Sequence, residues 1–106
     1  MYITQNDLVK IARDIGIDMS RTVLAIYRKK NPEIYEGVFK IIRGRAILTY
    51  EREKAIEILI ARELDKNSAK YDVRQRVRRD KNEITEIATK AVDEYIANKR
   101  PLDYVI

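Results

Sequence analysis

The chain contains no cysteine and no histidine, and only two prolines and three glycines occur among its 106 residues. Without cysteine and histidine it can form neither a disulfide bond nor a Cys/His zinc site. A cysteine nucleophile and a histidine base are excluded for the same reason. The sequence also has no Gly-rich phosphate loop and no recognisable spacing of paired carboxylates. We therefore expect no enzymatic activity, no cofactor, no metal and no small-molecule ligand.

Long apolar runs are missing as well. No stretch approaches the roughly 20 apolar residues that a membrane-spanning helix needs. The first seven residues are polar and do not resemble a signal peptide. These features predict a cytoplasmic protein without a membrane segment, and the length is sufficient for one small domain with a modest core.

Positive charge is in excess, with 22 Lys and Arg against 17 Asp and Glu. The excess lies in two blocks. Residues 1–50 carry nine basic and five acidic side chains, and residues 70–81 carry six basic and two acidic side chains. Positive charge clustered in this way favours a polyanionic partner such as nucleic acid.

Residues 39–48 predict a β-hairpin, because two short apolar, β-branched runs meet at Arg43-Gly44. Glycine supplies the positive φ angle that a tight hairpin turn needs. Arg45 follows the turn directly. The hairpin would therefore present guanidinium groups at its tip.

The remaining pattern is helical. Thr4 and Asp7 have capping-box spacing and predict a first helix that Gly16 ends. Ser20 or Asp18 is expected to cap a second helix. Helical spacing of apolar residues predicts that these two helices end near residues 15 and 30. A third helix is expected to be capped by Thr49 and to end near residue 66, and a fourth is expected to run from about residue 82 to about residue 98.

The second helix has two different sides on a helical wheel. Val23, Ile26 and Tyr27 cluster on one side, and we expect them to anchor the helix in the core. The other side carries arginines and small residues, which suit base contacts in the major groove because Arg can donate two hydrogen bonds to guanine. Together with the hairpin, the residues expected to contact DNA are Ser20, Arg21, Leu24, Ala25, Arg28, Lys29, Lys40, Arg43 and Arg45.

The order helix, glycine turn, helix, hairpin, helix resembles the winged helix-turn-helix domains of phage and transposon excisionases and of MerR-type regulators. The resemblance covers roughly residues 2–64, with a longer turn and a longer link to the hairpin than those families have. The residues that carry it are Ala12, Gly16, Thr22-Val23, residues 39–48 and residues 49–55.

This resemblance implies a mainly α fold. A winged helix-turn-helix domain with one β-hairpin wing would occupy residues 1–66, and a helical extension would follow over residues 67–106. It also implies a second helix in the major groove and a wing on the backbone or minor groove. By position, Arg21 and Arg28 would then read bases, and Arg43 and Arg45 would hold phosphates or the minor groove.

Two features lie beyond the resemblance. The basic run over residues 74–79 is a solvated helix face, a basic hinge that pairs with acidic residues, or a second phosphate-binding surface formed by Arg74, Arg76, Arg78 and Arg79. The last helix carries an apolar seam that packs within the chain or forms a dimer or partner interface, and we expect a homodimer. The seam residues are Ile84, Ile87, Ala88, Ala91, Val92, Tyr95 and Ile96.

The sequence thus predicts a dimeric, sequence-specific protein that binds double-stranded DNA, either a small transcription regulator or an architectural factor of a mobile element. A protein-binding adaptor or inhibitor that docks through the last helix is an alternative. RNA binding is a third possibility, although no aromatic stacking motif on a sheet supports it.

Overall fold

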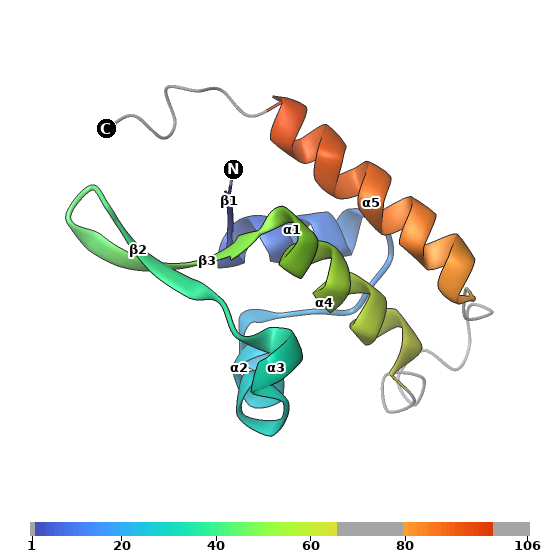
Figure 1. Ribbon diagram of the computed structural model, residues 1–106, viewed down its shortest axis with the longest axis horizontal. Helices are drawn as coiled ribbons and strands as arrows, with labels where there is room; N and C mark the ends of the chain where they lie inside the picture. The colour runs from blue at the N-terminus through green and yellow to red at the C-terminus, as the bar shows by residue number, and fades with distance from the viewer. Residues whose placement is uncertain (1, 66–79, 99–106) are drawn as a thin grey trace.

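A small antiparallel sheet with strand order β1–β3–β2 lies against a set of helices (Figure 1). The computed structural model describes residues 2–65 and 80–98. Its strands are β1 (Tyr2–Thr4), β2 (Val38–Ile42) and β3 (Arg45–Glu51). Its helices are α1 (Gln5–Asp14), α2 (Arg21–Lys30), α3 (Pro32–Tyr35), α4 (Arg52–Leu64) and α5 (Lys81–Asn98). The predicted mainly helical character is confirmed.

Local signals place the first two helices. The amide of Asp7 donates to Thr4 Oγ1 at 3.2 Å, and the amide of Thr4 donates to Asp7 Oδ2 at 3.4 Å, so the predicted capping box is confirmed. Gly16 follows α1 with a φ angle of +80°, which only glycine adopts readily. Ser20 caps α2 by accepting a hydrogen bond of 3.1 Å from the amide of Val23.

The hairpin is also confirmed, and its turn is as tight as predicted. Ile42 pairs with Arg45, which leaves a two-residue turn between the strands. Arg43 and Gly44 have φ angles of +53° and +78°. Positive φ at both central positions is typical of a type I′ turn, whose twist matches that of the flanking strands.

The prediction that Thr49 caps a helix was wrong. Thr49 lies inside β3, and its hydroxyl donates to the carbonyl oxygen of Val38 at 2.7 Å. The strand continues to Glu51, and α4 begins at Arg52 without a side-chain cap. A threonine before a helical pattern suits either a cap or a strand, and here pairing on both sides of β3 decides in favour of the strand.

β1 was not predicted. It pairs with β3, with Ile3 opposite Tyr50 and Thr4 opposite Thr49. Three residues are too few to show an alternating pattern. Ile3 is nevertheless fully buried, so this short strand anchors the start of the chain against the end of β3.

One hydrophobic core joins the sheet to all the long helices. α5 packs across α4 and near α1 (Figure 1), and its residues Ile84, Ala88 and Val92 are fully buried in the same cluster as Leu59 of α4. The core of residues 2–65 therefore extends onto α5. Within residues 2–65 and 80–98, no helix has the length and apolar character needed to cross a membrane.

Candidate nucleic-acid interface

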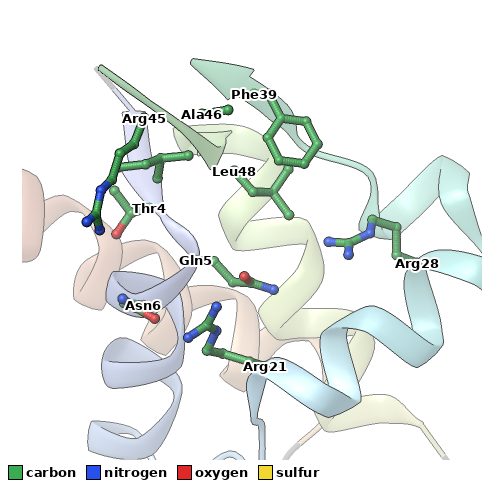
Figure 2. Close-up of a pocket in the computed structure, with 10 residues that line it drawn as sticks. Thr4, Gln5, Asn6, Arg21, Arg28, Phe39, Arg45, Ala46 and Leu48 are labelled. Atoms are coloured by element: carbon green, nitrogen blue, oxygen red, sulfur yellow. The ribbon is translucent and has the colours of Figure 1, made fainter. Parts of the chain in front are cut away.

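A groove of about 510 Å³ opens between the first turn of α1, the helix α2 and the hairpin (Figure 2). Arg21 and Arg28 line it from α2, and Arg45 lines it from β3. No Asp or Glu side chain belongs to its lining. Three guanidinium groups without a neighbouring carboxylate give the groove a positive potential that attracts anions.

Arg28 forms the inner wall of this groove. It is half-buried, and its Nη1 atom has no hydrogen-bond partner among the described residues. The hydroxyl of Tyr50, which is buried beside it, also has no partner of good geometry there. Burial raises the pKa of Tyr50, and the nearby positive charge of Arg28 only partly opposes this shift. The Nη1 atom of Arg28 is therefore a donor that an anion in the groove could accept from.

Seven of the lining residues were not predicted as site residues, and three of them carry polar or aromatic side chains that suit a ligand. Gln5 and Asn6 occupy the first turn of α1, and Phe39 projects from β2 (Figure 2). Amide side chains of this kind can recognise adenine through paired hydrogen bonds. Nothing in the local sequence marks Gln5 or Asn6, because only the tertiary fold brings the start of α1 beside Arg21.

α2 is rotated relative to the predicted orientation. Leu24, which was expected on the DNA-facing side, is fully buried in the core, whereas the expected anchor Ile26 is 46% exposed. Large apolar residues occupy four positions that span nearly half of the wheel, so the pattern alone does not fix which half faces inward. The exposed side of α2 instead carries Arg21, Thr22, Ile26 and Lys29.

Contacts with α3 and α4 explain this rotation. The ring of Tyr27 lies 5.3 Å from the ring of Tyr35, and the guanidinium carbon of Arg62 lies 5.1 Å from the Tyr27 ring. Arg62 is buried and donates to the carbonyl oxygen of Asp18 at 2.7 Å. Burial also raises the pKa of Tyr35 to about 12. These contacts draw the Tyr27 side of α2 inward together with Leu24.

Lys40 does not join the groove. Lys40 lies on the face of the hairpin opposite Phe39, and it is absent from the groove lining although Arg45, on the same face, belongs to it. The Nζ atom of Lys40 is 3.9 Å from a carboxylate oxygen of Glu51 and 4.9 Å from the ring centre of Tyr2. Lys40, which the sequence predicts as a DNA contact, therefore lies apart from the groove, and its contact with DNA stays a prediction.

The other predicted contacts are dispersed. Lys29 and Arg43 are exposed but do not line the groove, and Ala25 is half-buried. Ser20 is exposed with its hydroxyl engaged as the α2 cap. The secondary phosphate contacts predicted in the basic run lie outside the described residues, and these are Arg74, Arg76, Arg78 and Arg79.

The central residues of the apolar seam on α5 belong to the hydrophobic core of the chain. Ile84, Ala88 and Val92 are fully buried within this chain. The remaining seam residues pack partly against the same core, and these are Ile87, Ala91, Tyr95 and Ile96. The sequence favours a dimer or partner interface over packing within the chain, because a small winged domain offers little surface for a second long helix. However, α4 buries more than one of its sides and packs against these residues. Homodimerisation stays a prediction, and it would use other surfaces than these three central residues.

Within residues 2–65 and 80–98, acidic residues do not gather into a metal site. In the part of the chain that the structure describes, no group of three such side chains could hold a metal ion. Comparisons with protein-family models, with curated proteins and with solved structures give no match. The candidate interface is therefore defined by its own geometry and charge.

Proposed function

We propose that this chain binds double-stranded DNA through a winged helix-turn-helix surface in which α2 and the hairpin are the two arms. The observation that carries the proposal is the shared groove, which Arg21, Arg28 and Arg45 line and no Asp or Glu side chain lines. Two of these residues come from the helix and one from the hairpin. A DNA backbone seated there would contact both arms at once, with α2 directed into the major groove.

The three arginines differ in burial, and this suggests different roles. Arg21 is exposed at the start of α2 and is free to reach a base edge. Arg28 is half-buried against Tyr50 and suits a fixed contact to a phosphate. Arg45 is exposed near the tip of the hairpin and suits the phosphate backbone or minor groove.

The exposed side of α2 provides further contacts to base edges. Thr22 and Ile26 are both exposed there, and their methyl groups can contact the methyl group of thymine. We propose that they take the place that the sequence assigned to Leu24. A small transcription regulator or an architectural factor of a mobile element, acting as a dimer, fits such a surface.

Selection of bound sequences from a random duplex pool tests this function. We expect an enriched motif and, for a two-fold dimer, two half-sites about 10 base pairs apart or a multiple of that spacing. Arg21→Ala should lose preference at one position of the motif, whereas the control Lys90→Ala on α5 should keep the whole motif. Failure to retain duplex DNA above the level of a single-stranded RNA pool would contradict the proposal.

A further inference from the structure

One face of the hairpin carries two large apolar side chains that are exposed to solvent. Phe39 is 66% exposed and Ile41 is 74% exposed. They are two residues apart on β2 and therefore point to the same face of the hairpin. Their cross-strand neighbours are Leu48 and Ala46, and the methyl group of Ala46 is too small to cover Ile41.

This apolar face is turned toward the groove. Phe39, Ala46 and Leu48 all line the groove together with the arginines (Figure 2). Ile41 continues the same face toward the tip, one residue before Ile42 and the Arg43-Gly44 turn. Any ligand held between α2 and the hairpin would thus meet an apolar surface bordered by guanidinium groups.

Charge argues against a second copy of the chain that pairs with the β2 edge beside this face. β2 is an edge strand, and antiparallel pairing of two copies centred on it would place Lys40 directly opposite Lys40. Like charges opposite one another destabilise a strand pair, and an edge lysine is a known defence against such pairing. The nearby Arg43 and Arg45 would add to the repulsion between copies.

We propose that the hairpin bends the duplex it binds, with Ile41 inserted between base pairs from the minor groove and Phe39 packed behind it. Arg43 and Arg45 would hold the phosphates on either side. Proteins that bind the minor groove commonly insert apolar side chains in this way and kink the duplex. This inference rests on the proposed function and adds to it the deformation of the DNA.

The tight turn makes the hairpin suitable for insertion. A two-residue type I′ turn keeps the tip narrow, and the β2–β3 ladder runs from Val38 to the Ile42–Arg45 pair without interruption. The wedge is therefore held in place before binding, and little ordering is required. Because pyrimidine–purine steps unstack most easily, the bound sites should carry a TA or CA step beneath the hairpin.

Measurement of the bend angle by energy transfer between fluorophores at the two ends of a bound duplex tests this proposal. We expect the parent chain to bend the duplex by roughly 20–90°. Ile41→Thr keeps the β-branched shape that suits a strand but removes the apolar wedge, and it should reduce the bend by at least about half. Ile41→Val, which shortens the wedge by one carbon, should give an intermediate bend.

Val38→Thr is the matched control. Val38 is 57% exposed on the same strand, but its side chain points to the opposite face. This variant should bend the duplex as the parent does, and thermal melting should show all variants folded. A straight duplex in the parent complex, or an unchanged bend with Ile41→Thr, would overturn the wedge while leaving DNA binding intact.

Two other outcomes would also contradict insertion of Ile41, and the measurements of duplex binding and of sedimentation distinguish them. Absence of duplex binding by the parent would remove the proposed function as well. If Ile41→Thr instead lowers the mass of the free protein in sedimentation without changing the bend, the apolar face is a contact between copies of this chain.

Discussion

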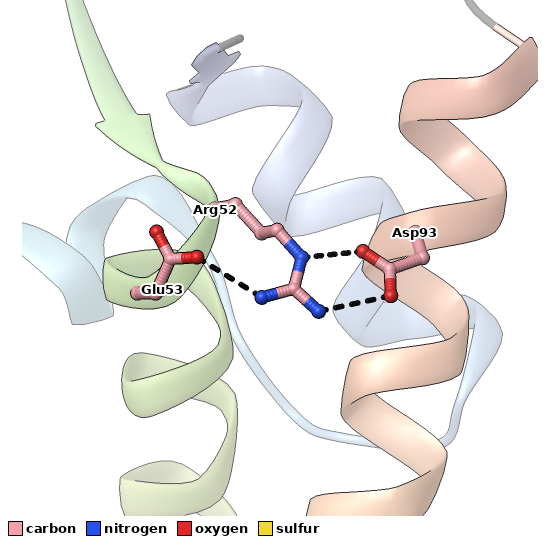
Figure 3. A network of polar contacts seen from close by, with 3 residues as sticks. All are labelled: Arg52, Glu53 and Asp93. Carbon is pink, nitrogen blue, oxygen red and sulfur yellow. Dashed lines mark hydrogen bonds and ion pairs between the residues drawn. The ribbon is translucent and has the colours of Figure 1, made fainter.

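Arg52 on α4 forms a two-bond ion pair with Asp93 on α5 (Figure 3). The distance from Nε to Oδ1 is 2.6 Å, and the distance from Nη2 to Oδ2 is 3.0 Å. The third nitrogen, Nη1, lies 3.0 Å from a carboxylate oxygen of Glu53. The guanidinium group holds the pKa values of both carboxyl groups below their usual range. This pair joins α5 to α4 at the surface, above the shared core.

The ion pair makes the docking of α5 sensitive to acid. Because the pKa of Asp93 is lower in the folded state, its contribution to stability is present above the ordinary value of 3.8 and is lost as the pH falls through the lowered pKa. Asp93→Asn should therefore melt at a lower temperature than the parent at neutral pH, and the difference should vanish in strong acid. The effect is small because both side chains are partly exposed to solvent.

Glu94→Gln is the control for this series of thermal melts. Glu94 is the next acidic residue on α5, and its ion pair with Lys90 is long, at 4.0 Å, and well exposed. This variant should melt close to the parent at every pH. Equal melting of parent and Asp93→Asn at neutral pH would show that the Arg52–Asp93 pair does not help to hold α5.

The orientation of α2 is tested by a pair of truncations. Leu24→Ala should reduce the free energy of unfolding by about 2–5 kcal/mol, because it removes a fully buried side chain. Ile26→Ala removes a side chain that is 46% exposed and should cost less than about 1 kcal/mol. Denaturant unfolding measures both values. If Ile26→Ala lowers the free energy of unfolding more than Leu24→Ala does, α2 has the orientation predicted from the sequence alone.

Gly37 holds the base of the hairpin in close contact with β3. A Cβ atom at this position would lie 2.5 Å from the carbonyl oxygen of Thr49 and 2.9 Å from the ring of Tyr50. Gly37→Ala should therefore destabilise the fold by about 1–3 kcal/mol through overpacking. The neighbouring Glu36→Ala, at an exposed position, serves as the control in the same unfolding titration. Equal stability of the two variants would contradict this close approach.

Structural features governed by neighbouring residues could be predicted from the sequence. The Thr4–Asp7 capping box and the Arg43-Gly44 turn each depend on residues within a few positions of one another, and both are present. Thr49 failed as a predicted cap because its role depends on strand pairing with Val38, eleven residues away. The direction of α2 likewise depends on α3 and α4, which a helical wheel does not include.

The residues of the candidate site likewise include some that the sequence could predict and some that only the tertiary structure brings together. Arg21, Arg28 and Arg45 could be predicted because arginine beside a helix pair and a hairpin turn is a chemical signal in the sequence itself. Gln5 and Asn6 could not, since their side chains carry no such signal and enter the groove only because β1 fixes the start of α1 beside β3. The sequence pattern identified the charged groups, and the tertiary structure supplied the polar residues around them.

The salt dependence of duplex binding tests the shared groove most directly. Arg21→Ala/Arg45→Ala changes two exposed lining residues, and the control Lys81→Ala/Lys90→Ala removes the same charge from α5, which does not line the groove. We predict that the groove variant binds about tenfold or more weakly and that its plot of log affinity against log salt is shallower by about two units. The control should stay close to the parent in both respects. Equal losses in the two double variants would mean that net charge alone drives binding, and the groove would not be the DNA-binding site.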